Sequence, residues 1–331
     1  MVVHIFCNER ILRLISVFLA VIIVFASVLP FCISVAAQEL NREAAAQKMK
    51  QGFYNFESKI DMSGLGVTPQ NIGDIFIFVL KNDPYLFFVG TKLSYLYKTD
   101  GTMEIYPKYN MSASDAAQGI KYCTDEVKRL ASGVDPRMSE AEAALFVHDL
   151  ICAEFSYDTS YTFADMLGFL TTKTGTCQGY AWTYMAVLRE LGIECCYVAS
   201  DTINHIWNMV KIEGEWYHCD LTWDDGGEQN DRRHFLCSDK KAKQMGHRDW
   251  YSAYGTRCTS EKYDSADLSL LTHDLYSGDG DHSGELELYD LLALIVGKGD
   301  SFCPMCADVN SDMACDEIDA EILRQKLVGL N

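Results

Sequence analysis

The order of hydrophobic and polar residues in the first third of the chain indicates a helix followed by strands. Residues 42–50 have the composition of a helix, and strand-like runs follow at 84–98 and 103–110. Turn-forming residues at 99–101 separate the two runs. This pattern predicts a small α+β region over residues 38–132. No group of reactive side chains stands out in it, so we expect it to have a structural or substrate-shaping role.

Two later segments have the spacing of amphipathic helices. The first follows Ser139, where Ser-Glu-Ala-Glu forms a capping box. The second begins at Cys177, and Gly192 is placed to end it. Their hydrophobic faces consist of Ala144, Leu145, Val147, His148 and Ile151 in the first helix, and of Ala181, Tyr184, Met185, Leu188 and Leu191 in the second. We expect the core domain to begin just before the first helix and to cover residues 133–260.

The segment after residue 204 has the pattern of a β-hairpin. Two strand-like runs, 205–212 and 215–223, flank Glu213 and Gly214, which predicts a two-residue turn. The turn sets the expected register, with Ile212 opposite Glu215, Trp207 opposite Asp220, and His205 opposite Thr222. Residues 205, 207, 220 and 222 would then share one face of the sheet. On that face His205 and Asp220 are diagonal neighbours within hydrogen-bonding reach.

The N-terminal pattern differs from that of the rest of the chain. Arg10 and Arg13 precede an uncharged hydrophobic run, residues 14–37, which ends in small residues. This favours an export signal over residues 1–37, cleaved after Ala37, and therefore a secreted or extracellular protein with no membrane attachment after cleavage. The run is also long enough to cross a bilayer, so a retained anchor is the alternative.

Composition and charge exclude some classes of structure and partner. A chain of 331 residues is too long for one ordinary core, which indicates two or three packed units. The hydrophobic content of 48% is enough for a folded interior. With 47 acidic and 28 basic residues, the net charge of -19 repels phosphate backbones. We therefore expect no nucleic-acid partner.

The cysteines do not define a disulfide framework. The chain has 13 cysteines, and Cys7 and Cys32 lie in the expected signal. An odd number then remains, and connectivity cannot be read from spacing alone, so we predict no specific disulfide. Cys303 and Cys306 form a C-x-x-C pair, for which zinc binding, redox exchange and a small disulfide stay open. A structural role is favoured for this pair.

The C-terminal 64 residues, 268–331, contain 13 acidic and three basic residues. Two acidic clusters repeat at an offset of 29 residues, and each has the spacing of a twelve-residue EF-hand loop. Hard oxygen donors at this spacing favour Ca²⁺. The predicted ligands are Asp279, Asp281, Ser283, the carbonyl of Glu285 and Asp290 in the first loop, and Asp308, Asn310, Asp312, the carbonyl of Ala314, Asp316 and Asp319 in the second.

Because each loop ends in Asp and leads directly into a helix, residues 268–331 resemble a dockerin domain, joined to the core by a linker at 261–267. The resemblance implies an all-α module with two Ca²⁺ ions that docks to a cohesin module of a scaffold protein, such as that of a cellulosome. Met313 replaces a glycine of the family pattern, and Cys315 replaces an aliphatic residue. We therefore expect weaker Ca²⁺ binding by the second loop.

Cys177 is a candidate nucleophile because it lies at the start of a predicted helix. The positive end of a helix dipole favours a thiolate and also holds an oxyanion. Gly175 and Gly179 keep side chains away from the sulfur. A thiol nucleophile also needs a base, and His205 lies beside Asp220 in the predicted hairpin. The carboxylate would fix the ring tautomer and stabilise the imidazolium.

Three ordered motifs around these residues resemble the transglutaminase-like superfamily. They are Gly-x-Cys-x-Gly-Tyr-Ala at 175–181, His-x-Trp-Asn at 205–208 and Trp-Tyr-His-x-Asp-x-Thr-Trp at 216–223. The resemblance implies a papain-like α+β core. It also implies that Cys177 is the nucleophile, that His205 is the general base and acid, and that Asp220 is the orienting carboxylate.

Other residues of these motifs have expected supporting roles. We expect Trp207 and Trp223 to pack the site and His218 to make structural hydrogen bonds. Papain-type enzymes complete the oxyanion hole with a side-chain donor upstream of the cysteine, but no glutamine lies just before Cys177. Tyr157 and Tyr161 are the candidates for this donor, although an ordinary structural role is favoured for both.

Together these features predict a secreted, scaffold-docked cysteine enzyme that acts on protein or peptide substrates. It would form a thioester from a peptide or side-chain amide and pass the acyl group to water, which makes a cysteine protease the favoured function. A protein-glutamine transglutaminase, which uses an amine acceptor, is one alternative. A non-catalytic binding module of the cellulosome or cell surface is another.

Overall fold

The computed structural model describes residues 42–136, 138–160, 165–225, 232–252, 254–265, 268, 291, 309–310 and 317–328. The predicted signal at 1–37 lies outside these residues. The chain divides into two compact units, Met1–Leu80 with Val89–Asn110, and Lys81–Phe88 with Met111–Asn331. None of the helices in the described ranges combines the length and the apolar character needed to cross a membrane.

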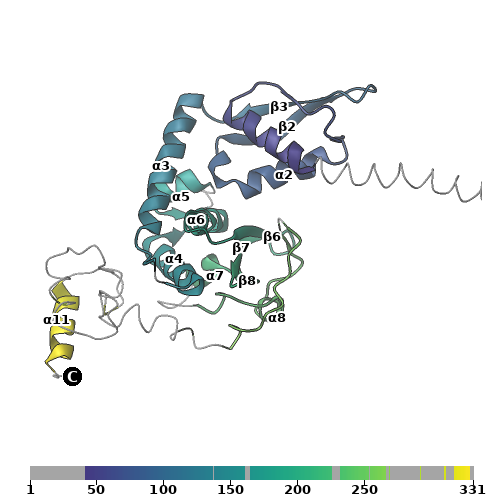
Figure 1. The fold of residues 1–331 in the computed structure, drawn as a ribbon. Coiled ribbons are helices and arrows are strands. Elements are labelled where there is room, and N and C mark those ends of the chain that lie inside the picture. Colours follow the sequence, from purple (N-terminus) through teal and green to yellow (C-terminus); the bar gives the residue numbers. More distant parts are fainter. Residues whose placement is uncertain are drawn as a thin grey trace, which may run out of the picture. The chain divides into compact units, whose positions relative to one another are not determined.

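The first unit combines helical residues with a three-stranded sheet. Residues 42–54 are helical, and α2 (Ile72–Asn82) belongs to this unit except for its last two residues. The sheet has the order β1-β3-β2 and consists of β1 (Ile60–Asp61), β2 (Val89–Tyr97) and β3 (Met103–Tyr109) (Figure 1). The mixed α+β character expected for this part of the chain is therefore present.

The strand predicted at 84–98 starts later than expected. Its first residues form a 3₁₀-helix, η1 (Pro84–Leu86), before β2 begins. The carboxylate of Asp83 accepts the backbone N–H of Tyr85 at 3.1 Å and caps this short helix. The ring of Pro84 fixes its φ angle near the value that the first turn of a helix requires. Local capping therefore overrides the strand pattern at these positions.

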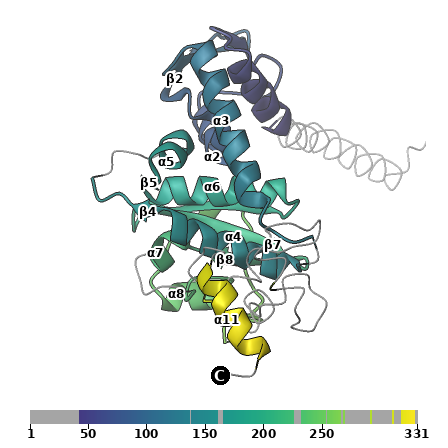
Figure 2. The ribbon, with the colours of Figure 1, turned by 90° about the vertical axis from the view of Figure 1, so that its left-hand side faces the viewer.

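The second unit is built around α6 (Cys177–Glu190), whose hydrophobic positions are buried. It packs against α3 (Ala113–Ala131), α4 (Glu140–Glu154) and α5 (Met166–Thr172). The hydroxyl of Tyr184 on α6 donates to the carbonyl of Ala144 on α4 at 3.0 Å. Figure 2 shows α4 and α6 beside each other in this unit. The predicted amphipathic helices thus form the interior of the core.

The capping box predicted before α4 is confirmed. The hydroxyl of Ser139 accepts the N–H of Glu142 at 3.3 Å, and the Glu142 carboxylate accepts the N–H of Ser139 at 2.7 Å. Ser139→Ala is expected to lower the free energy of unfolding by about 1 kcal/mol because it removes the cap acceptor. Urea denaturation measures this loss. Ser139→Asp keeps an acceptor and serves as the control, and an equal loss in both variants would contradict the capping role.

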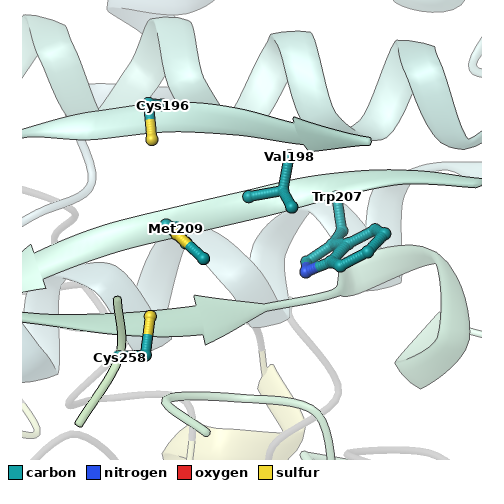
Figure 3. Close-up of a cluster of buried hydrophobic side chains, with 5 residues drawn as sticks. All are labelled: Cys196, Val198, Trp207, Met209 and Cys258. Atoms are coloured by element: carbon teal, nitrogen blue, oxygen red, sulfur yellow. The ribbon is translucent and has the colours of Figure 1, made fainter. Parts of the chain in front are cut away.

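A four-stranded antiparallel sheet forms a second layer of this unit. Its order is β8-β7-β6-β9, formed by β6 (Cys195–Ser200), β7 (His205–Ile212), β8 (Glu215–Cys219) and β9 (Tyr251–Ser252). Helix α6 contacts β6 and β7, and the Asn208 side chain donates to the carbonyl of Ala181 at 3.0 Å. A buried cluster of alternate residues on β6 and β7, together with a cysteine from a later segment, includes Cys196, Val198, Trp207, Met209 and Cys258 (Figure 3).

The turn predicted between β7 and β8 is confirmed. Glu213 and Gly214 have φ angles of 51° and 87°, and positive values at both positions are typical of a type I′ turn. Ile212 lies opposite Glu215, as the two-residue turn requires.

The predicted pairing of His205 with Thr222 is wrong. Strand β8 ends before Asp220, and Thr222 belongs to α7 (Leu221–Asp225). The Oδ1 atom of Asp220 accepts the backbone N–H of Trp223 at 3.3 Å, as an N-cap side chain does. A capping carboxylate therefore turns the chain into a helix where the strand was expected to continue. The predicted pairing of Trp207 with Asp220 is also missing from the β7–β8 register, which starts at Asn208 and Cys219, but His205 and Asp220 still make the predicted contact.

Shorter elements complete the described structure. Strands β4 (Ser156–Tyr157) and β5 (Thr174–Gly175) form a parallel pair immediately before α6. Helix α8 (Asp239–Gln244) follows the hairpin, and α11 (Glu317–Leu327) lies near the C-terminus.

Candidate active site

Cys177 is the first residue of α6, and its thiol is free and partly exposed. Strand β5 leads into the extended N-cap residue Thr176, whose carbonyl accepts the N–H of Gly179 at 2.9 Å. The sulfur therefore lies at the positive end of the helix dipole, which favours negative charge there. This arrangement agrees with the placement expected from the sequence.

Gly179 has a packing role that the sequence interpretation did not include. A Cβ atom at this position would lie 2.7 Å from the ring of Phe169 on α5. Phe169 is itself stacked on Phe155, with ring centroids 4.5 Å apart. Close approach of α5 and α6, rather than access to the sulfur, therefore accounts for this glycine.

His205 connects the thiol with a buried carboxylate. Its Nε2 atom lies 2.7 Å from Oδ2 of Asp220, and Cys177 lies near enough to raise the pKa of the imidazole. Burial lowers the pKa of His205, but the charge and hydrogen bond of Asp220, followed by the hydrogen bond with Cys177, raise this pKa to about 10. The three side chains expected to form the site therefore lie close together, with His205 paired to Asp220 and influenced by Cys177.

The electrostatic environment of Asp220 keeps this carboxylate ionised. Burial by itself raises its pKa, but the charge and hydrogen bond of His205 and the hydrogen bond of His247 lower the pKa well below its usual value. The side chain of Asp220 is only 1% exposed. A buried charge of this kind is stable only with such partners.

Two tryptophans restrict the orientation of the His205 ring. The ring lies nearly parallel to Trp223, with centroids 5.0 Å apart at 11°, and to Trp207, with centroids 5.6 Å apart at 17°. Trp207 is 1% exposed and belongs to the buried cluster on the sheet (Figure 3). Stacking of this kind limits rotation of the imidazole about its side-chain bonds. Both tryptophans therefore pack the site.

His247 also contacts the carboxylate and was missed in the sequence interpretation. Its Nε2 atom lies 2.8 Å from Oδ2 of Asp220, the same oxygen that His205 contacts. Its ring packs against Trp223 with centroids 4.2 Å apart and against Trp207 with centroids 4.6 Å apart. The site therefore contains two histidines on one carboxylate.

A local sequence signal explains how His247 reaches this position. Gly246 ends α8 with a φ angle of 110°, and the N–H of His247 bonds back to the carbonyl of Ala242 at 3.0 Å. This is the hydrogen-bond pattern of a helix C-terminus that is closed by glycine. The dipeptide Gly246-His247 after a short lysine-rich helix was thus the available signal. It shows where the chain turns, but it does not show which carboxylate the histidine meets.

His218 has the structural hydrogen-bonding role expected for it. Its Nδ1 atom accepts the indole N–H of Trp207 at 2.9 Å, and its Nε2 atom lies 3.0 Å from Oδ1 of Asp239. Burial lowers the pKa of His218 despite the opposing effect of Asp239. A neutral ring with its proton on Nε2 satisfies both contacts.

A second cluster of buried charged side chains is centred on His148. The two ring nitrogens of His148 lie 2.9 Å from Asp149 and 3.1 Å from Asp224. Asp224 also contacts His234 at 2.7 Å, and Arg232 donates to Asp149 at 3.1 Å. Burial lowers the pKa of His148, but the hydrogen bonds and charges of Asp149 and Asp224 raise this pKa to about 9.

The ionisation of His148 makes the free energy of unfolding depend on pH. Because the pKa of His148 is raised in the folded state from its ordinary value of 6.5 to about 9, its contribution is complete below pH 6.5 and is lost as the pH rises through 9. The free energy of unfolding, measured with urea, should therefore fall across this range. His148→Gln should show a smaller fall than the wild type. Equal pH dependence in the two proteins would contradict the assignment.

Two groups in the described part of the chain have the composition of metal sites, His205 with Asp220 and His247, and His218 with Asp239 and Cys258. Ligand atoms on a tetrahedral zinc ion lie about 3.3 Å from one another, given metal–ligand distances of about 2.0–2.1 Å. The nitrogen–oxygen distances here are 2.7, 2.8 and 3.0 Å. These distances are shorter than those between two zinc ligands and are typical of hydrogen bonds, so we interpret both groups as hydrogen-bonded clusters.

Most of the predicted calcium ligands lie outside the described residues. Asn310 and Asp319 are described, and the backbone N–H of Asn310 donates to Oδ1 of Asp319 at 3.3 Å. The ligands outside the described residues are Asp279, Asp281, Ser283, Glu285, Asp290, Asp308, Asp312, Ala314 and Asp316. The Cys303 and Cys306 pair lies outside them as well.

One of the two candidate oxyanion donors is described. Tyr157 on β4 lies opposite Gly175 on β5, two residues before the thiol, and is partly buried. Tyr161 lies outside the described residues.

The segment that carries these three side chains matches a known family. Residues 128–221 match the sequence model of the transglutaminase-like superfamily. The second unit has a transglutaminase-like core. The match begins within α3 and ends one residue after Asp220, so it includes all of α4, α6 and the β7–β8 hairpin.

Individual relatives match parts of this transglutaminase-like core. Kyphoscoliosis peptidase of Mus musculus and that of Homo sapiens are each 31% identical over 71 residues, and the match covers 17% of this chain and 11% of the relative. The chain thus spans about a tenth of the length of these curated relatives.

Solved structures with detectable similarity include a crystal structure of a TGase, at 13% identity and a TM-score of 0.31, covering 47% of this chain and 50% of that one. Another is a candidate cysteine protease from Cytophaga hutchinsonii, at 13% identity and a TM-score of 0.27, covering 49% of this chain and 72% of that one.

Proposed function

We propose that the transglutaminase-like core is a cysteine enzyme that cleaves amide bonds through a thioester intermediate. The observation that supports this function most directly is the position of His205, which pairs with Asp220 at 2.7 Å and whose pKa Cys177 also helps to raise. A thiol, an imidazole and a carboxylate in this order are the parts that nucleophilic catalysis requires.

The proposed reaction has two stages. In the first, Cys177 attacks the amide carbonyl, His205 receives the thiol proton and passes it to the departing amine, and the C–N bond breaks to leave a thioester. In the second, water attacks the thioester while His205 accepts a proton from the water. The carboxylic acid product then leaves, and the proton returns to the sulfur. The N-terminus of α6 stabilises the oxyanion in both stages.

Hydrolysis is the favoured outcome, and the curated relatives that match the core carry the name peptidase. The alternative is transfer to an amine, because the same thioester serves both reactions. Incubation with casein and a labelled amine separates the two functions. New amino termini without label incorporation support the protease, and incorporation of the label supports the transferase. Neither product should form with Cys177→Ala, and product formation by this variant would refute catalysis through Cys177.

We also propose that the protein is exported and that its C-terminal repeat binds Ca²⁺ and docks to a cohesin module. Support comes from the acidic repeat and from Asp319, which is fully buried at the start of α11 and accepts the N–H of Asn310. These residues are positions 12 and 3 of the second loop, which a calcium loop brings together. Calorimetric titration with Ca²⁺ should detect two sites in the wild type and one in Asp319→Ala. Two sites in the variant would contradict the assignment.

A further inference from the structure

The carboxylate of Asp220 has more hydrogen-bond donors than a catalytic triad requires. Oδ2 lies 2.7 Å from Nε2 of His205 and 2.8 Å from Nε2 of His247. Oδ1 accepts the backbone N–H of Trp223 at 3.3 Å. Since a carboxylate only accepts, both ring nitrogens must carry protons. Two imidazoles therefore compete for the negative charge of one oxygen atom.

The surroundings of His247 determine its protonation state. Its Nδ1 atom is buried, and it has no hydrogen-bond partner within the described part of the chain. A proton on Nδ1 would be a buried donor without an acceptor, which costs roughly 1–3 kcal/mol. The geometry therefore favours the tautomer with its proton on Nε2, directed at Asp220. His247 thus acts toward Asp220 as a hydrogen-bond donor.

We propose that His247 is a positioning residue that shares the carboxylate of Asp220 with His205 and so limits how strongly Asp220 retains the proton of His205. This inference rests on the proposed catalytic role of Cys177 and His205. Its basis is geometric: both Nε2 atoms converge on one oxygen, and Trp207 and Trp223 pack against both imidazole rings.

Sharing of the carboxylate affects how readily His205 releases its proton in the proposed reaction. His205 must release its proton to the departing amine, and an acid whose pKa lies far above the working pH releases it poorly. Asp220 stabilises the imidazolium, and a second donor on the same oxygen reduces the negative charge that His205 experiences. Without the N–H of His247, the pKa of His205 should rise further.

Other titratable groups near the two rings are paired elsewhere. His234 lies with its ring centroid 5.7 Å from that of His247, but its Nδ1 atom is paired with Asp224 at 2.7 Å. His218 uses both ring nitrogens in its contacts with Trp207 and Asp239. Cys177, at the start of α6, acts on His205 and helps to raise its pKa. Asp220 is thus the acid group that the two rings share.

Alkylation of Cys177 by iodoacetate provides the test, because an anionic reagent reacts best while His205 is an imidazolium. The rate is measured by mass spectrometry of the peptide that contains Cys177, in EDTA, across a range of pH. His247→Phe keeps an aromatic ring packed against the tryptophans but removes the N–H donor. We expect the high-pH decline in the alkylation rate to shift upward by about one pH unit. His247→Leu provides a smaller replacement with the same expected shift.

His247→Gln is the matched control, since its side-chain N–H reaches about as far as Nε2 of histidine. It should keep the decline near the wild-type position. An unchanged decline in folded His247→Phe or His247→Leu, or an equal shift in His247→Gln, would overturn the proposal. Circular dichroism identifies the folded variants. If the wild type shows no imidazolium-dependent decline at all, the proposed catalytic pair fails instead, so the two failures are distinguishable.

Nitrogen-15 NMR of the wild type gives a test that needs no variant. The proposal requires that Nε2 of His247 carries a proton directed at Asp220. A ring that carries its proton on Nδ1 alone would overturn it. If His247 had only a structural role, replacing it would not shift the pH at which alkylation of Cys177 declines.

Discussion

Replacement of Cys177 by alanine is expected to lower kcat for amide cleavage by about 10⁴-fold or more, because no other group replaces the nucleophile that forms the thioester. Fold stability should change little, since the thiol is partly exposed at the start of α6. The measurement is the rate at which new amino termini appear from a protein substrate.

Cys123→Ala is the control for this substitution. Cys123 is a buried thiol on α3 whose pKa is raised to about 12 by burial, so it is a poor nucleophile at neutral pH. We expect this variant to retain activity. Retained activity in Cys177→Ala, or equal losses in the two variants, would show that Cys177 is not the nucleophile.

Replacement of Asp220 by asparagine should have the second largest effect, a loss of about 10³-fold to 10⁴-fold in kcat. Asparagine keeps the shape and one acceptor oxygen for the two histidines, but it removes the negative charge. The pKa of His205, which Asp220 helps to raise to about 10, should then fall toward its ordinary value. The high-pH decline in activity should therefore move to lower pH, opposite to the shift expected for His247→Phe.

The pH profile of kcat/KM for Asp220→Asn measures this shift. Asp249→Asn removes an exposed carboxylate two residues after His247 and serves as the control. The control should leave both the rate and the profile unchanged. If Asp220→Asn lowers the rate but leaves the high-pH decline in activity at the same pH, the carboxylate orients His205 but does not raise its pKa.

Parts of the fold that depend on local rules were predictable from the sequence. Ser139 and Glu142 form the expected capping box, and Glu213 and Gly214 form the expected two-residue turn. Because a two-residue turn fixes the register up to Asn208 and Cys219, it brings His205 and Asp220 close together, although Asp220 lies just beyond the end of β8. The strand pattern gave the wrong structure after Asp220. The side chain of Asp220 caps α7, so these residues form a helix despite their strand-like composition.

Contacts between distant segments were not predictable. His247 reaches Asp220 from 27 residues away, and His148 meets Asp224 from 76 residues away. No turn or helix period relates these positions, so their contact depends on how α4, α7 and α8 pack. The sequence identified His205 as the base, but packing alone determined that His247 shares its carboxylate.

The central claim is that His205 and Cys177 act as one proton-transferring pair, and the pH dependence of alkylation by iodoacetate in wild type and His205→Ala tests it most directly. In the wild type we expect rapid alkylation of Cys177 at neutral pH and a decline as His205 loses its proton near pH 10. In folded His205→Ala we expect slow alkylation at neutral pH, a rate that only increases with pH, and no decline. The same profile in both proteins would contradict the account.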